Sequence, residues 1–321
     1  MTAPDLRDRL MGSLVGVLVG DALGVPVEFT GRAMRDQDPV TGMRGHGTWN
    51  QPPGTWSDDG AMTLVTADVL ATCGWNLAKF MDGFLGWLDE GLWAAHGRAF
   101  DIGNRTRNSL TLYRIDHEVR DCGGDEERDN GNGSLMRCQP ISCWLFGSPL
   151  EEMMVKAGEA SALTHAHPRS RLCCAWHALW CDAILSGRDV RAAARYASDR
   201  LRRHVPSGER PYLADMLEGL VFDRKRKHLA SDGYVVSTIA ASLWCLKQHG
   251  DFRSATLAAV NLGGDTDTTA AVTGGMAGLR GGLTSIPLEW VKALPRNDEI
   301  MALANRFTDA CLEHWSRHGT C

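Results

Sequence analysis

Two short segments far apart in the sequence carry the same combination of carboxylate and hydroxyl side chains. They are Ser57, Asp58 and Asp59 in the first segment and Asp265, Asp267 and Thr268 in the second. Each segment precedes a stretch that we expect to be a helix, where an Asp or Thr oxygen commonly accepts the orphan backbone N–H groups of the first turn. For the second segment by itself, capping is the simpler interpretation. Capping needs one carboxylate per helix, however, and each segment offers two.

If the two helix starts meet in space, four carboxylates converge, and without cations they would repel and raise one another's pKa values. Two divalent cations would balance this charge. The six side chains include no thiolate and no imidazole, which argues against zinc or copper and favours hard cations. We therefore predict a site for two Mg²⁺ or Mn²⁺ ions built from both segments.

The overall composition is that of an ordinary globular protein. Of the 321 residues, 44% are hydrophobic and 23% are charged, and the formal net charge is -5. This charge gives no electrostatic signature of nucleic-acid binding. The ten cysteines include no Cys-x-x-Cys pair, so we expect buried thiols in a cytoplasmic protein rather than a zinc ribbon or a disulfide scaffold.

The apolar run from Met11 to Leu23 could be mistaken for a signal peptide. Its leader, residues 5–9, carries as much acid as base, and Asp21 stands where a small-residue cleavage site should be. The run is also short for a bilayer span. We predict a buried helix and no membrane partner.

Helical periodicity recurs along the chain and strand signals are scarce. The expected helices include residues 6–23, 77–95, 151–163, 170–185, 190–203, 235–248, 251–260 and 269–282. Residues 31–55 have no period and predict a surface loop of the kind that covers or lines a site. We predict an all-α fold: one domain over residues 1–321, a compact orthogonal helical bundle with the binuclear metal site at one end.

Glycines at every fourth position add a packing prediction to this fold. Gly12, Gly16 and Gly20 form a stripe without side chains on the first helix. Such a stripe lets another backbone approach closely, and the small-residue helix 269–282 is the candidate partner.

Three further features indicate a polar ligand. Glu28 and Asp101 are carboxylates in apolar surroundings, although a lone Glu is usually solvated. Residues 131–134, Gly-Asn-Gly-Ser before a helix, expose backbone N–H groups suited to phosphate, although Asn-Gly is also a common turn. His165 in a His-x-His pair favours hydrogen bonding to a ligand or the backbone over metal binding, because no third ligand is near.

Six motifs in order carry a resemblance to a known family. They are Gly16-x-x-x-Gly-Asp-Ala-Leu-Gly with Glu28, Trp56-Ser-Asp-Asp-x-Ala-Met62, Phe100-Asp-Ile-Gly-Asn, Gly131-Asn-Gly-Ser-Leu-Met-Arg137, Thr164-His and Leu262-Gly-Gly-Asp-Thr-Asp-Thr268. From about Leu10 to Gly282 the chain resembles the ADP-ribosylglycohydrolase family, in the branch that includes the dinitrogenase reductase-activating glycohydrolase and the ADP-ribosylarginine hydrolases.

The resemblance implies roles for the residues that match its motifs. Ser57, Asp58 and Asp59 would serve one metal, Asp265 and Thr268 the other, and Asp267 would bridge. Glu28 and Asp101 match acidic positions beside the scissile bond and the distal ribose, and are the expected catalytic pair. The substrate would contact Gly103, Gly131, Asn132, Gly133, Ser134 and His165.

Two positions lie outside the matched pattern. Tyr212 is our choice for the aromatic that stacks on adenine, which no motif fixes. Gly60 follows the paired aspartates where the family commonly has threonine, which predicts a looser turn.

The resemblance implies a metal-dependent hydrolase that releases ADP-ribose from modified protein side chains, arginine first, by cleavage at C1″ of the distal ribose. The expected partners are an ADP-ribosylated protein and ADP-ribose, for a monomer without membrane or nucleic-acid partners. Three alternatives remain open. The linkage could be to serine, to an acetyl group or to nucleic acid; the protein could be a non-catalytic ADP-ribose reader; or it could be a metal-dependent phosphohydrolase with an unrelated substrate.

Overall fold

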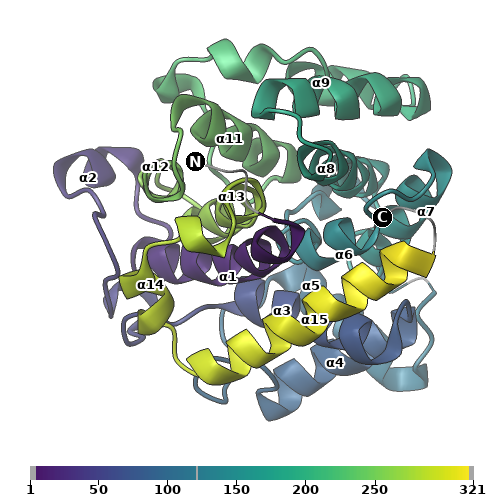
Figure 1. The fold of residues 1–321 in the computed structure, drawn as a ribbon, viewed down its shortest axis with the longest axis horizontal. Coiled ribbons are helices and arrows are strands. Elements are labelled where there is room, and N and C mark those ends of the chain that lie inside the picture. The colour runs from purple at the N-terminus through teal and green to yellow at the C-terminus, as the bar shows by residue number, and fades with distance from the viewer. Residues whose placement is uncertain (1–4, 121, 318–321) are drawn as a thin grey trace.

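The structure, a computed structural model, describes residues 5–120 and 122–317, and within these ranges it contains helices, short 3₁₀ turns and no β-strand (Figure 1). The predicted all-α fold is confirmed. The longer helices are α1 (Leu6–Gly24), α3 (Asp58–Cys73), α4 (Leu77–Glu90), α5 (Asn104–Asp116), α7 (Leu150–Ala162), α8 (Pro168–Leu185), α9 (Val190–Leu201), α11 (Val235–Gln248), α12 (Phe252–Val260), α13 (Thr266–Gly281) and α15 (Asn297–Arg317). The shorter ones are α2 (Arg32–Gln37), α6 (Gln139–Trp144), α10 (Arg210–Leu217) and α14 (Leu288–Ala293).

Helices α1 and α13 pack side by side at the centre of the molecule (Figure 1). The predicted glycine stripe is the reason. A Cβ on Gly16 would lie 2.3 Å from the carbonyl oxygen of Gly274, and one on Gly20 would lie 2.0 Å from that of Ala270. At the end of α1, a Cβ on Gly24 would lie 2.3 Å from the Cα of Asp267. The stripe therefore holds the start of α13, which carries Asp267, against the end of α1, which leads to Glu28.

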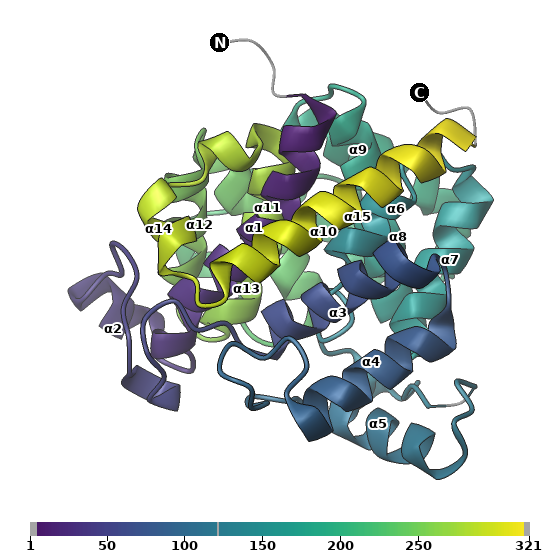
Figure 2. The same ribbon diagram turned by 60° about the horizontal axis from the view of Figure 1, so that its bottom comes forward.

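The remaining helices enclose this central pair. Helices α8, α11 and α12 pack on α13, whereas α3 and α15 pack on α1, with α15 running across the outside of α3 (Figure 2). Buried apolar side chains from all of these helices form one hydrophobic cluster. Burial at this scale is the main favourable contribution to folding.

Helix α1 is apolar enough to resemble a membrane span. Residues 6–27 have a mean hydropathy of 1.8 and are long enough to cross a bilayer, so the expectation that this run is too short was wrong. Residues 10–27 are buried inside the protein, however, which confirms the predicted buried helix.

Two predicted segments differ from the structure. Helix α4 ends at Glu90 rather than Ala95, because Gly91 adopts the left-handed conformation and donates to the carbonyl groups of Gly86 and Trp87. Residues 31–55 contain α2 and the 3₁₀ turn η2 (Gly47–Trp49), which packs on the turn η1 (Val25–Val27) that follows α1. This segment is therefore fixed against the site.

Candidate active site

The two acidic helix starts meet, as predicted. Asp58 and Asp59 occupy the first turn of α3, and Asp267 and Thr268 occupy the first turn of α13. The hydroxyl of Thr268 donates to Asp59 Oδ1 across a distance of 3.4 Å. All four side chains are buried. Residues more than 200 positions apart therefore share one site.

Helix capping explains only part of this cluster. The Ser57 hydroxyl accepts a hydrogen bond from the backbone N–H of Asp59, so Ser57 caps α3. Asp265 precedes α13, yet its side chain makes no capping hydrogen bond. Asp265 Oδ1 and Asp59 Oδ2 are buried and have no hydrogen-bond partner among the described residues. Buried oxygens of this kind are costly unless a ligand satisfies them.

Asp21 is a member of the cluster that the sequence analysis did not assign to the site. It lies fully buried on α1, and its carboxylate accepts hydrogen bonds from the backbone N–H groups of Ser57 and Gly60, at 2.8–3.0 Å. It thus fixes the start of α3 against α1. The sequence feature that could have assigned Asp21 to the site is a charged residue inside an otherwise apolar helix.

Gly60 is closely packed rather than loose. A Cβ at this position would lie 2.8 Å from the side chains of Leu18 and Trp56. The predicted looser turn is therefore wrong, because the backbone of Gly60 is held by Asp21 and its α-carbon is enclosed by apolar groups.

The carboxylates form two groups that share one residue. Oxygens of Asp21, Asp59 and Asp267 lie within 4.8 Å of one another, and so do oxygens of Glu28, Asp265 and Asp267. Both groups consist only of oxygen donors. The first group contains Asp59 and the second contains Asp265, the two residues that have a buried carboxylate oxygen without a hydrogen-bond partner in the described part of the chain. This donor set fits hard divalent cations such as Mg²⁺ or Mn²⁺, and Asp267 belongs to both groups.

The electrostatics of the cluster agree with a cation site. Burial, followed by repulsion from neighbouring carboxylates, raises the pKa values of Asp58, Asp59 and Asp267 well above the usual range. Burial also raises the pKa of Asp21 to about 7, against hydrogen bonds from Ser57 and Gly60 that lower it. Negative charge at this density needs protons or cations to be stable.

Glu28 and Asp101 face each other beside the cluster. Burial raises the pKa of Glu28 to about 7 and that of Asp101 to about 10, and the two carboxyl groups contact each other. Trp49 on η2 donates its indole N–H to Glu28 Oε2 at 2.5 Å, and Thr48 donates to the Glu28 carbonyl oxygen at 2.7 Å. The segment 31–55, which we expected to be a surface loop that covers or lines a site, thus positions the carboxylate of Glu28.

The glycine-rich turn at 131–134 lies on another side of the cluster. Asn132 donates its side-chain N–H to Asp265 Oδ2 at 2.8 Å, which connects the turn to the carboxylates. The backbone N–H groups of Gly133 and Ser134 donate to no other group in the described part of the chain. Free N–H groups of adjacent residues suit an anion such as phosphate.

His165 lies directly behind this turn. A Cβ on Gly133 would be 2.8 Å from the imidazole, so glycine is required for the close approach. Burial, together with the charges of Arg137 and Arg105, lowers the pKa of His165 to about 3, so the ring is neutral. Thr164 Oγ1 accepts from Arg137 and lies 2.8 Å from Nδ1 of His165. With the hydroxyl as donor, the ring proton sits on Nε2, which faces the turn.

One cavity of about 290 Å³ connects these parts. Most of the predicted site residues line it: Glu28, Asp58, Asp59, Asp101, Gly103, Gly131, Asn132, Gly133, His165, Asp265 and Thr268. Residues that the sequence analysis did not assign also line it, among them Phe29, Arg105 and Arg128.

Four predicted residues do not line this cavity. Ser57, Ser134 and Asp267 are buried, and the Ser134 hydroxyl accepts a hydrogen bond from Ser161. The structure does not bring Tyr212 to the cavity. Its ring instead stacks on the guanidinium of Arg169, 3.6 Å from the ring centroid.

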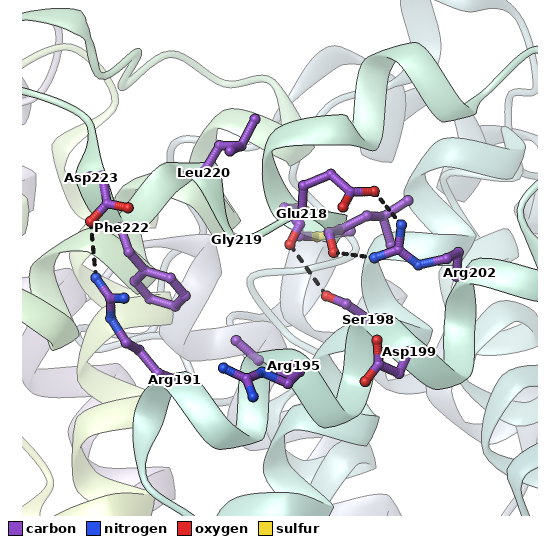
Figure 3. A pocket seen from close by; sticks show the side chains of 13 residues that line it. Arg191, Arg195, Ser198, Asp199, Arg202, Glu218, Gly219, Leu220, Phe222 and Asp223 are labelled. Atoms are coloured by element: carbon purple, nitrogen blue, oxygen red, sulfur yellow. Dashed lines mark hydrogen bonds and ion pairs between the residues drawn. The ribbon is translucent and has the colours of Figure 1, made fainter.

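A second cavity, of about 400 Å³, lies between α9 and the segment formed by α10 and η5 (Leu220–Asp223) (Figure 3). Three arginines and three carboxylates line it: Arg191, Arg195, Arg202, Asp199, Glu218 and Asp223. Arg191 pairs with Asp223 at 3.0 Å, and Arg202 pairs with Glu218. None of its lining side chains, all within the described residues, has a buried polar atom without a partner.

The fold and the first cavity together define an all-α protein with an acidic cavity that could hold metal ions, next to a glycine-rich turn. The model of the ADP-ribosylglycohydrolase family matches residues 2–317. The chain is 32% identical over 301 residues to the ADP-ribosylarginine hydrolase Tri1 of Serratia proteamaculans (strain 568), covering 93% of this chain and 78% of the relative. It is 31% identical over 298 residues to the ADP-ribosyl-[dinitrogen reductase] glycohydrolase of Rhodospirillum rubrum, covering 92% of each chain.

A solved structure described as an ADP-ribosylglycohydrolase-related protein complex matches with a TM-score of 0.81 at 30% identity, covering 95% of this chain and 98% of that one. The chain therefore belongs to the ADP-ribosylglycohydrolase family, as its motifs indicated, and is a hydrolase of this class.

Proposed function

We propose that this protein removes ADP-ribose from arginine side chains of modified proteins, with two Mg²⁺ or Mn²⁺ ions as cofactors. The observation that carries the proposal is the pair of carboxylate groups that share Asp267, beside a cavity that the glycine-rich turn lines through Gly131, Asn132 and Gly133. The names of the Serratia and Rhodospirillum relatives support the reaction class, and the former supports arginine as the acceptor.

Each part of an ADP-ribosyl group has a complementary set of residues in or beside this cavity. The pyrophosphate binds at the N–H groups of Gly133 and Ser134, beside the neutral imidazole of His165. The distal ribose lies over Asp265 and Asp59, whose buried oxygens have no protein partner. Metal ions held by Asp59, Asp265 and Asp267 would supply positive charge there, which would orient the ribose hydroxyls and water and offset developing negative charge.

Glu28 and Asp101 divide the proton transfers between them. Trp49 donates to Glu28, and a hydrogen bond to the ionised form favours that form, so Glu28 is the base that accepts a proton from the attacking water. Asp101 is the acid. As the bond between C1″ and the guanidino nitrogen breaks, its electron pair stays on nitrogen, which takes a proton from Asp101 while the water oxygen bonds to C1″. General acid–base help of this kind contributes about 10²–10⁴-fold to the rate.

The test is incubation of the purified protein with an ADP-ribosylated arginine peptide and an ADP-ribosylated serine peptide, with and without Mg²⁺ or Mn²⁺. We expect release of ADP-ribose from the arginine peptide only, and only with metal. Release from the serine peptide instead would show that the enzyme cleaves the serine linkage. Binding of ADP-ribose without any release would indicate a non-catalytic ADP-ribose reader.

A further inference from the structure

Phe29 is an unusual residue at the rim of the acidic cavity. Its side chain is 68% exposed, although phenylalanine is among the residues most often buried. Its backbone has φ 61°, a conformation that costs energy for a residue with a bulky side chain. Its N–H donates to the carbonyl oxygen of Gly264 at 2.7 Å, which holds the strained backbone against the segment that carries Asp265. The fold thus fixes an apolar ring in solvent beside the candidate catalytic Glu28.

The ring belongs to an aromatic group built around Glu28. Phe29 and Trp49 contact each other edge to face, with centroids 6.4 Å apart, and Trp49 contacts Phe100 at 5.7 Å. Phe100 directly precedes Asp101, and Trp49 donates to Glu28. The three rings therefore lie next to the proposed acid and base. Of the three, Phe29 lines the cavity.

The aromatic group and the glycine-rich turn contact the carboxylates through different residues, and Phe29 and the turn line the same cavity. The turn connects to Asp265 through Asn132, and the aromatic group connects to Glu28 through Trp49. Oxygens of Glu28, Asp265 and Asp267 lie within 4.8 Å of one another, so these carboxylates link the two contacts. If the pyrophosphate lies at the turn and the distal ribose over the carboxylates, the group attached to C1″ lies in the part of the cavity that Glu28, Phe29 and Asp101 line.

We propose that Phe29 is the acceptor-recognition residue, and that its ring face binds the guanidinium of the ADP-ribosylated arginine. This inference rests on the proposed function and adds the residue that selects a cationic acceptor. A guanidinium over an aromatic ring is stabilised by the ring quadrupole, and the carboxyl groups of Glu28 and Asp101 provide negative charge beside it. A serine acceptor carries no cation and gains nothing from the ring. The exposed, strained position of Phe29 follows from this role.

The test compares Phe29→Leu, which keeps the apolar bulk without an aromatic face, with Phe29→Trp, which keeps such a face. Two quantities are measured in saturating Mg²⁺: kcat and KM for an ADP-ribosylated arginine peptide, and Kd for ADP-ribose, which has no acceptor. We expect Phe29→Leu to lower kcat/KM by about 2- to 30-fold, mainly through KM, and to leave the Kd for ADP-ribose unchanged. Phe29→Trp should retain kcat/KM.

Leu288→Ala is the matched control, because Leu288 is also an exposed apolar residue, at 62%, but lies on α14 away from the cavity. Equal kcat/KM values for wild type and Phe29→Leu would overturn the role of Phe29 while leaving the proposed function intact. A weaker Kd for ADP-ribose in Phe29→Leu would overturn it too, because the ring would then contact the nucleotide. An inactive wild type on the arginine peptide would remove the proposed function and this inference together.

Discussion

Two of the cavities of this protein, the arginine-lined one between α9 and α10 and the acidic one at the candidate active site, contain similar numbers of charged side chains but differ in how those charges are satisfied. Around the arginine-lined cavity, Arg191 and Arg202 are paired with carboxylates, and opposite charges balance (Figure 3). In the acidic cavity, carboxylates lie next to other carboxylates. Asp59 and Asp265 each have a buried oxygen without a hydrogen-bond partner among the described residues. The charges of the arginine-lined cavity are thus balanced within the protein, whereas those of the acidic cavity need cations. Unsatisfied charge, rather than volume, identifies the site.

The largest expected effect comes from removing the residue that both carboxylate groups share. Asp267→Ala should lower kcat/KM on an ADP-ribosylated arginine peptide by about 10³-fold or more, because several kcal/mol of metal-dependent stabilisation are lost. Asp223→Ala removes a carboxylate from the arginine-lined cavity and should leave activity unchanged. Steady-state kinetics on the two variants test the comparison, and near-normal turnover in Asp267→Ala would contradict the metal assignment.

Replacing the proposed base should lower kcat and leave the affinity for ADP-ribose unchanged. We expect Glu28→Gln to lower kcat by about 10²-fold or more, because the carboxylate that accepts the proton is lost. Titration calorimetry with ADP-ribose in Mg²⁺ should give a Kd near that of the wild type. Unchanged kcat would remove Glu28 from the mechanism.

Metal ions should stabilise the acidic cavity and its fold. At 100 times its Kd, a ligand of the folded state adds about 2.7 kcal/mol of stability, so Mg²⁺ should raise the thermal unfolding midpoint of chelator-treated protein. Asp267→Ala should reduce this rise, and Asp223→Ala should preserve it. A midpoint that does not respond to Mg²⁺ or Mn²⁺ would contradict the cation site.

The stability of metal-free protein should also depend on pH in a defined direction. Burial raises the pKa values of Asp21 and Glu28 to about 7 and that of Asp101 to about 10. Raised pKa values mean that the folded state holds these protons more tightly, so their stabilising contribution is present at low pH and is lost as pH rises through these values. We expect the unfolding midpoint in chelator to fall between pH 7 and pH 9, and to fall less in Mg²⁺.

The smallest effect is expected in the arginine-lined cavity. Arg202→Ala removes an ion pair whose side chains are 41% and 51% exposed, and exposed pairs contribute about 0–1 kcal/mol. Denaturant unfolding should therefore show a small change and kinetics none. A large loss of activity would mean that this cavity contributes to function and would break the comparison.

The sequence alone predicted much of this site because the chemistry lies in compact motifs. Asp58 and Asp59 in one segment, and Asp265 and Asp267 in another, were placed together by charge reasoning, and the structure confirms that they meet. The glycine stripe of α1 predicted its close contact with α13, since only glycine lets two backbones approach to this distance. Periodicity predicted the all-α fold, although helices α5 and α15, the end of α4 and the structure within residues 31–55 were missed.

The remaining features depended on tertiary contacts. Asp21 belongs to the site because α1 buries it against the backbone of Ser57 and Gly60, and Tyr212 lies away from the cavity because its ring stacks on Arg169. No local pattern encodes either contact. The sequence determined the ligand types, the helices and the family, since these follow from side-chain chemistry and short-range spacing. Only the tertiary structure decided which charges remain without partners, because desolvation and pairing depend on segments far apart in the chain.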